Sequence, residues 1–138
     1  MVQTITPRGR KQDLLYSDLR KDMLANLVNA DVSRYTDEEA VKESIKNLVL
    51  TDVGERLFQP NIGCDVRRLL FENFTPQTKN SIEVQVKSTI EQYETRCNLI
   101  SVIATSSPDE YSVLITVVFN VINKIDNVVL ELVLERAR

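Results

Sequence analysis

Hydrophobic residues recur at helical spacing through the middle of the chain and at every second position in its last third. Thr36 and Glu39 have the spacing of a capping box, in which a hydroxyl and a carboxylate each accept a hydrogen bond from a free backbone N–H. The apolar residues that follow, with a period of three to four, are Val41, Ile45, Leu48 and Val49. Gly54 ends the run. The pattern predicts a first helix from Asp37 to about Leu50.

Two further helices are predicted before residue 94. Asp65 can cap a short second helix. Its apolar face carries Val66, Leu69, Leu70 and Phe74. Thr75 and Pro76 form an N-cap followed by proline at the first helical position. The apolar face of this third helix carries Ile82, Val86, Ile90 and Tyr93. The stretch Gly54–Gly63 holds two of the three glycines and a proline, which predicts an ordered connector between the first two helices.

After Arg96 the hydrophobic period changes to two, and β-branched residues dominate. Three strands are predicted, at Leu99–Thr105, Tyr111–Ile122 and Val128–Glu135. Turn-forming residues separate them, so the simplest arrangement is an antiparallel meander. One face of the middle strand must lie on the second or third helix, and it carries Tyr111, Val113, Ile115, Val117, Phe119 and Val121. In the last strand Val128, Leu130, Leu132 and Leu134 face one way, opposite Val129, Glu131, Val133 and Glu135.

This order of elements predicts an α+β fold, in which an N-terminal arm precedes three helices and a three-stranded antiparallel sheet packed on them. We assign residues 1–35 to the arm and residues 36–138 to a single α+β domain. Within the arm, Met23 to Val28 can form one or two helical turns. With 138 residues, 43% of them hydrophobic, the chain can bury a core without a metal or a disulfide.

The composition excludes most familiar enzyme chemistry. The chain has no histidine, which removes Ser-His-Asp and Cys-His nucleophile schemes and His-containing zinc sites. It has no P-loop, GxGxxG motif or EF-hand spacing, so no cofactor or metal is expected. A net charge of -3 and the lack of a long apolar run argue against nucleic-acid and membrane partners. Cys64 and Cys97 lack CxxC spacing and are expected as reduced thiols of a protein folded in a cytoplasm.

The residues alone leave several functions open. A glycoside hydrolase needs only two carboxylates about 5 to 9.5 Å apart, and Glu55, Asp65 and Glu72 lie near the connector. The chain lacks tryptophan, however, and a helix cap or a local ion pair accounts for Asp65 and Glu55 more simply, so no catalytic residue is expected. A three-stranded sheet also leaves an unpaired edge. Glu131 and Glu135 can protect that edge or set the register of an added partner strand.

Several short motifs follow one another between Asp31 and Pro76. They are Asp31-Val32-Ser33-Arg34, Ser44-Ile45-Lys46-Asn47-Leu48, Thr51, Gly54-Glu55-Arg56, Phe58, Pro60, Gly63-Cys64-Asp65 and Leu70-Phe71-Glu72-Asn73-Phe74-Thr75-Pro76. In this order they resemble the baseplate wedge and sheath-initiator family of contractile tails. Members of that family occur in myovirus tails and, as relatives, in type VI secretion baseplates, and some carry a historical lysozyme label. The resemblance extends from about Tyr16 to the C-terminus.

The resemblance implies a binding site for the core helical bundle of the baseplate wedge. Glu94-Thr95-Arg96 stands where the family has a Glu-Pro-Arg signature, with threonine in place of proline. The outer two residues of the signature are implicated in gripping the bundle, so Glu94 and Arg96 are expected to bind wedge core-bundle proteins. Tyr16, Ser17 and Asp18 fit the N-terminal arm of the family, which implies that neighbouring subunits order this segment.

The resemblance also implies that the C-terminal sheet imitates the tail sheath protein and accepts strands from the first sheath ring. The expected contact residues are Val129, Glu131 and Val133 of the last strand, and the strand Leu99–Thr105 is the next candidate. The implied protein is a non-enzymatic structural subunit of the virion tail baseplate, made in the host bacterial cytoplasm and present in multiple copies around the tail axis. A peptidoglycan-degrading glycosidase and a generic intracellular adaptor are the alternatives.

Overall fold

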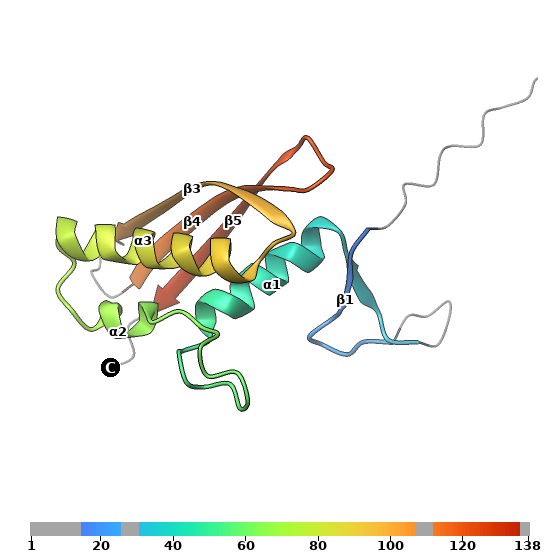
Figure 1. Cartoon of the computed structure of the whole chain (residues 1–138), viewed down its shortest axis with the longest axis horizontal. Coiled ribbons are helices and arrows are strands. Elements are labelled where there is room, and N and C mark those ends of the chain that lie inside the picture. The colour runs from blue at the N-terminus through green and yellow to red at the C-terminus, as the bar shows by residue number, and fades with distance from the viewer. Residues whose placement is uncertain (1–14, 26–30, 107–111, 136–138) are drawn as a thin grey trace, which may run out of the picture.

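The computed structural model describes residues 15–25, 31–106 and 112–135 of the chain. Its helices are α1 (Glu38–Leu50), α2 (Val66–Leu70) and α3 (Pro76–Tyr93). They are followed by β3 (Cys97–Ser106), β4 (Ser112–Val121) and β5 (Asn127–Glu135), and a separate strand pair, β1 (Ser17–Leu19) and β2 (Arg34–Thr36), precedes α1. The predicted α+β class is confirmed, because three helices lie against one antiparallel sheet (Figure 1).

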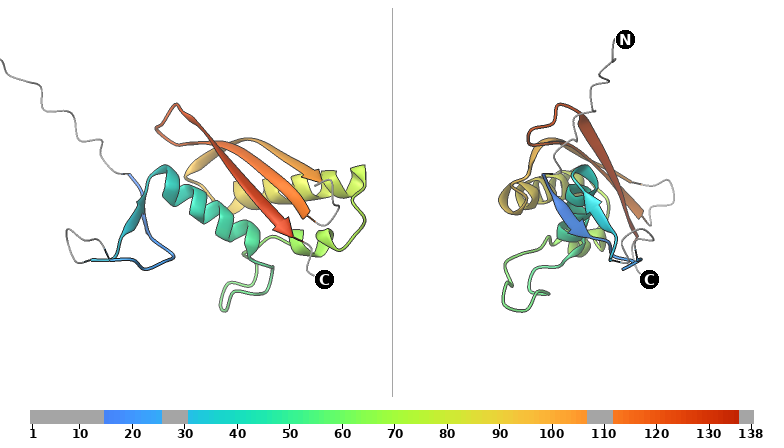
Figure 2. Two further views of the ribbon diagram at one scale, coloured as in Figure 1. Left: turned by 180° about the vertical axis from the view of Figure 1, so that it is seen from behind. Right: turned by 90° about the vertical axis from the view of Figure 1, so that its right-hand side faces the viewer.

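The main sheet is the predicted meander, with strand order β3-β4-β5 and antiparallel pairing throughout. Its register aligns Ala104 with Ile115 and Leu132 across the three strands. A register shift between Leu99 and Ser101 leaves Ile100 without a partner on β4. The helices lie to one side of this sheet, as the views from behind and from the end show (Figure 2).

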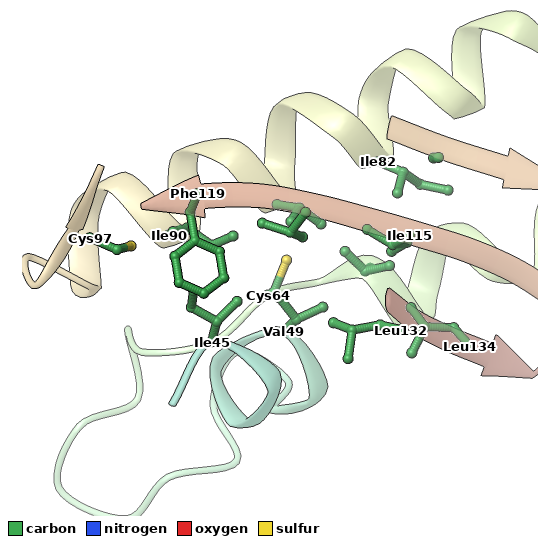
Figure 3. Packing of buried hydrophobic residues seen from close by; sticks show 14 of the residues in the cluster. Ile45, Val49, Cys64, Ile82, Ile90, Cys97, Ile115, Phe119, Leu132 and Leu134 are labelled. Atoms are coloured by element: carbon green, nitrogen blue, oxygen red, sulfur yellow. The ribbon is translucent and has the colours of Figure 1, made fainter. Parts of the chain in front are cut away.

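The core lies between the inner face of the sheet and the helices (Figure 3). The predicted apolar face of β4 is buried, and the described residues that form it are Val113, Ile115, Val117, Phe119 and Val121. Tyr111, which was predicted to share it, lies outside the described residues. Ile45 and Val49 from α1 and Ile82 and Ile90 from α3 pack into the same cluster. Cys64 and Cys97 are free and buried, as expected of reduced thiols.

The starts of the helices confirm one of the three predicted caps. Thr75 caps α3 as predicted, because its Oγ1 accepts a hydrogen bond from the N–H of Thr78 at 3.2 Å, and Pro76 occupies the first turn. The predicted cap at Asp65 is wrong, because Asp65 precedes α2 but its side chain makes no capping hydrogen bond. The capping box at Thr36 is wrong, since Thr36 belongs to β2 and α1 begins after Asp37.

The described part of the arm is a two-stranded antiparallel sheet rather than a helix. Ser17 to Leu19 pair with Arg34 to Thr36, and Ala25 forms an isolated bridge with Val32. The predicted helical turns are therefore wrong for Met23 to Ala25. The rest of that prediction falls in residues 26–30, which lie outside the described chain. Tyr16 packs against the core, so contacts within the chain itself contribute to holding this segment, and its ordering by neighbouring subunits stays a prediction.

Candidate functional site

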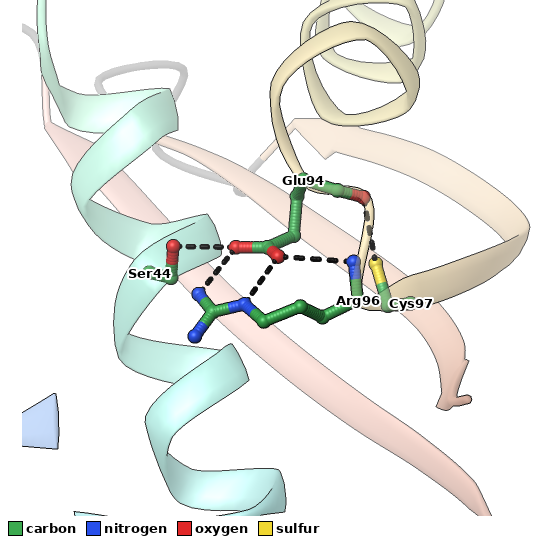
Figure 4. A network of polar contacts seen from close by, with 4 residues as sticks. All are labelled: Ser44, Glu94, Arg96 and Cys97. Carbon is green, nitrogen blue, oxygen red and sulfur yellow. Dashed lines mark hydrogen bonds and ion pairs between the residues drawn. The ribbon is translucent and has the colours of Figure 1, made fainter. Parts of the chain in front are cut away.

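Glu94 lies at the corner where α3 ends and β3 begins, and its side chain is turned inward (Figure 4). Only 4% of the residue is exposed. Arg96 donates from Nε to Oε1 at 2.7 Å and from Nη2 to Oε2 at 2.8 Å, and the Ser44 hydroxyl on α1 donates to Oε2 at 2.5 Å. Both carboxylate oxygens are therefore occupied within the chain. We call these three residues the Glu94 cluster.

The electrostatics of the Glu94 cluster favour the charged carboxylate. Burial by itself would raise the pKa of Glu94, but the hydrogen bonds from Arg96 and Ser44 outweigh it, so the pKa lies below its usual value. The hydrogen bond with Glu94 in turn raises the pKa of Arg96. Such a bidentate arrangement fixes the plane of the guanidinium and limits its rotation.

Arg96 is the member of the cluster that reaches the surface. Its side chain is 30% exposed, and its guanidinium lies 5.7 Å from the centroid of the Tyr16 ring, a cation–π contact. Nε and Nη2 are used by Glu94, whereas Nη1 has no hydrogen-bond partner among the described residues. Glu94 therefore positions a guanidinium that still has donors to offer.

Asp37 links the N-terminal arm to the domain through hydrogen bonds. Its Oδ1 accepts hydrogen bonds from the backbone N–H of Leu15 at 2.9 Å and of Tyr16 at 3.1 Å, and its N–H donates to the carbonyl of Tyr16. Lys124, in the turn after β4, lies 3.4 Å from Oδ2 of Asp37. These donors overcome the effect of burial and lower the pKa of Asp37.

The structure brings only part of the predicted site together. Tyr16, Glu94 and Arg96 are in contact, and Asp18 lines a hollow of about 230 Å³ beside them, together with Ser44, Asn47, Leu48, Arg56, Ile62 and Tyr93. Ser17 is exposed on β1. The other three predicted residues, Val129, Glu131 and Val133, lie on a different element, β5.

The two edges of the main sheet differ. On β3, the backbone N–H of Ala104 donates to Oε1 of Glu83 on α3 at 2.9 Å, so a helix side chain caps this edge. Ala104 stands opposite Ile115, and because its N–H points away from β4, that pair is not hydrogen-bonded. The backbone N–H and C=O of Ile115 therefore point away from β3 and toward β5. The pair that Ile115 forms with Leu132 on β5 is thus a hydrogen-bonded pair.

This alternation fixes the direction of the backbone donors on β5. The N–H of Leu132 points toward β4, so those of Glu131 and Val133 point to the other side, where no described strand pairs with β5. The side chains of both residues, and that of Val129, are exposed on the sheet face away from the core. The predicted inward and outward faces of β5 are thus confirmed, and its outer edge is open within the described chain.

Sequence reasoning missed Ser44, Asp37 and Glu83, the residues that position the two sites. Ser44 lies 50 positions before Glu94, and Glu83 lies 21 positions before Ala104. Nothing in the local pattern marks either of them, because each matters only once α1 and α3 have packed beside β3.

Histidine is absent from the sequence, so the candidate metal ligands and nucleophiles are cysteine and acidic side chains. No three His, Cys, Asp or Glu side chains in the described ranges are placed to share a metal ion. Burial, and then the charge of Glu94, raise the pKa of the Cys97 thiol to about 11, which makes it a poor nucleophile at neutral pH. None of the described helices combines the length and apolarity that crossing a bilayer requires.

Comparison with known proteins identifies the class of this fold. The family model described as baseplate wedge protein gp25 matches residues 36–124. Baseplate wedge protein gp25 of Enterobacteria phage T4 is 34% identical over 114 residues, which are 83% of this chain and 86% of the relative. The fold and the sequence thus define a baseplate wedge protein of a contractile tail. The chain belongs to the gp25 family.

Solved structures share the fold. A protein from Geobacter sulfurreducens, described as a candidate tail lysozyme, has a TM-score of 0.67 at 28% identity, over 73% of this chain and 92% of its own. A chain of the anti-feeding prophage baseplate has a TM-score of 0.61 at 20% identity, over 89% of this chain and 87% of its own. The second similarity concerns the fold alone.

Proposed function

We propose that this chain is a non-enzymatic structural subunit of a tail baseplate wedge, which starts assembly of the sheath by accepting a strand at the outer edge of β5. The observation that carries the proposal is the difference between the two sheet edges. Glu83 caps β3, whereas β5 presents the N–H groups of Glu131 and Val133 outward. An added strand would use these backbone groups for affinity.

A groove at the end of β5 supports this assignment of the edge. It measures about 510 Å³ and is lined by Leu50, Arg67, Leu70, Phe71, Val133, Leu134 and Glu135. Recognition by strand addition takes its specificity from pockets that receive alternate side chains of the added strand. A sheath strand paired with β5 would run past this groove and could place an apolar side chain in it.

The Glu94 cluster is the proposed contact with the wedge core bundle. Arg96 carries the exposed donors, Glu94 and Tyr16 contact its guanidinium, and Ser44 holds the Glu94 carboxylate. The contact is therefore assigned to Arg96, with Glu94 as the positioning residue. Together with the β5 edge it would join a wedge to a sheath subunit, in copies arranged around the tail axis of the virion.

Arg96→Ala should weaken binding to a purified wedge complex that lacks this subunit. A charge-assisted hydrogen bond is worth about 1.5 to 3 kcal/mol, which corresponds to roughly a tenfold to hundredfold loss of affinity. Binding can be measured by titration with variants whose folding is checked by circular dichroism. Lys87→Ala, which also removes a cationic side chain and breaks an exposed pair with Glu91, is the matched control and should bind as wild type does. Equal binding by both variants would contradict the assignment.

The competing function is a wall-degrading glycosidase, favoured by the tail lysozyme description of one structural relative. A glycosidase needs a general acid whose pKa is raised. The described carboxyl groups with a displaced pKa are Asp22, Asp37 and Glu94, and in all three the pKa is lowered. Glu55, moreover, accepts a hydrogen bond from the N–H of Asp52 at 3.0 Å, which gives it a structural role in the connector.

Glu55→Gln and Glu72→Gln should therefore leave any peptidoglycan-degrading activity of the purified protein unchanged, at the background level of the assay. Zymography on peptidoglycan with protein free of contaminating lysozyme is the measurement. A robust activity that either substitution abolishes would establish the enzyme and overturn the structural proposal. Co-assembly with tail sheath protein distinguishes a sheath initiator from a generic adaptor, because an adaptor would not nucleate sheath.

A further inference from the structure

The connector between α1 and α2 presents two large apolar side chains to solvent. Leu57 is 86% exposed and Phe58 is 99% exposed, and the loop that carries them projects from the body of the molecule (Figure 1). Val53 in the same loop is also exposed. Single exposed apolar residues are common, but adjacent leucine and phenylalanine side chains that are both almost fully exposed on one loop form an unusual surface.

This loop is held in shape by its own hydrogen bonds and by α3. The N–H of Gly54 donates to the carbonyl of Pro60 at 2.8 Å, which closes the loop around the two apolar residues. The Tyr93 hydroxyl donates to the carbonyl of Asn61 at 2.6 Å, which ties the loop to the last turn of α3. At Gly63 the chain passes so close to itself that a Cβ would lie 2.8 Å from the carbonyl oxygen of Thr51.

Phe58 adopts a backbone conformation that a bulky residue rarely takes. Its φ is 71°, in the left-handed region, where a side chain with a Cβ meets steric resistance. The folded chain thus accepts backbone strain at the residue whose ring contacts water. Strain of this kind persists where the surroundings fix the backbone, and it clusters at functional sites.

We propose that Leu57 and Phe58 form a preorganised anchor that inserts into an apolar pocket on another protein subunit of the baseplate. That the partner is a baseplate subunit rests on the proposed function. Arg56, beside the anchor, is exposed and has no ion pair among the described residues, so it fits a pocket with an acidic rim. Phenylalanine and arginine are enriched at protein–protein interfaces, and a rigid loop lowers the entropy lost on binding.

The position of the loop favours a protein over a membrane as its partner. Arg56 and Tyr93 line the same hollow as Asp18 and Ser44, so the loop borders the Glu94 cluster and the two can contact one continuous partner surface. A membrane-binding loop needs a second signal, usually a cluster of basic residues. The loop instead carries Asp52 and Glu55 beside Arg56, and the chain has a net charge of -3.

Leu57→Ser and Phe58→Asn should each weaken binding to the wedge complex lacking this subunit at least tenfold. Asparagine tolerates the left-handed backbone, so Phe58→Asn should keep or raise the melting temperature. The matched control is Ile125→Ser, which removes an apolar side chain that is 96% exposed in the β4–β5 turn, and it should change binding less than twofold. Two parallel experiments measure binding of the same variants to vesicles of phosphatidylglycerol and phosphatidylcholine, and their self-association by sedimentation.

Weakened wedge binding by both loop variants, with an unchanged control, supports the anchor. Unchanged wedge binding overturns it, as does an effect seen only on vesicles or on self-association, or a wild-type chain that does not bind the wedge. Sheath nucleation on the bound wild-type subunit is scored separately. If the loop variants lose wedge binding while the bound wild type nucleates no sheath, the sheath proposal fails and the anchor stands.

Discussion

Glu131→Pro should block sheath polymerisation from the baseplate while the subunit itself still folds. Proline removes the backbone N–H, and at Glu131 that group points to the open edge of β5 rather than to β4. Edge strands tolerate proline at such positions because no ladder hydrogen bond is lost. An incoming sheath strand would lose a donor and meet the proline ring, so the yield of full-length sheath seen by electron microscopy should fall to background.

Two substitutions on the same strand serve as controls. Glu131→Ala keeps the N–H and should nucleate sheath at the wild-type rate. Leu132→Pro removes an N–H that points at β4 and leaves a carbonyl of Ile115 unpaired, so it should lower the free energy of unfolding by about 1 to 3 kcal/mol or more. If Glu131→Pro folds and still nucleates sheath of normal length, the recruiting edge is not β5, and β3 must be tested next.

The elements of the main domain could be predicted from the sequence because each has a clear local signal. The apolar period of two in β4 matches its buried positions, and Thr75-Pro76 marks the start of α3 as observed. β3 begins two residues earlier than predicted, at Cys97, which pairs with Val121. Local periodicity locates the centres of elements well, whereas their ends depend on partners elsewhere in the chain.

The arm and the start of α1 could not be predicted, because non-local pairing takes over residues with strong local preferences. Thr36 would suit a helix cap, but it pairs with Ser17 in the β1–β2 sheet. The Asp37 carboxylate, which could cap the helix, accepts hydrogen bonds from Leu15 and Tyr16 instead. These contacts join residues that are 19 to 22 positions apart, and no short window of sequence contains both partners.

The candidate sites were only partly predictable for the same reason. The resemblance to the wedge family pointed to Glu94 and Arg96, but not to the buried position of Glu94 or to its bond with Ser44. The exposed residues of β5 could be predicted from the alternation of apolar and polar residues along the strand. The direction of its free N–H groups could not, because it follows from the hydrogen bond between Ala104 and Glu83. The exposure of Phe58 depends on the closed shape of the connector, which composition alone does not specify.

Glu94→Ala should lower the free energy of unfolding by about 3 kcal/mol. Breaking a buried ion pair by removing one partner costs about 3 to 5 kcal/mol, and the lower end applies because Arg96 is partly exposed and can turn to water. Urea unfolding followed by circular dichroism gives the measurement. Glu91→Ala is the matched control, since it removes an exposed pair with Lys87 near the same end of α3 and should cost less than about 0.5 kcal/mol.

The same residue should make stability depend on pH in acid. The pKa of Glu94 is lower in the folded state than its usual value of 4.5, so the unfolded chain binds more protons than the folded chain as pH falls. The stabilisation is complete above pH about 4.5 and is lost as pH falls through the lower folded-state pKa. Asp37 contributes in the same direction, so the wild type is compared with Glu94→Gln, which retains Asp37. The difference in unfolding free energy between the two should shrink below pH 4.5, and a constant difference down to pH 2 would contradict the assignment of this acid sensitivity to Glu94.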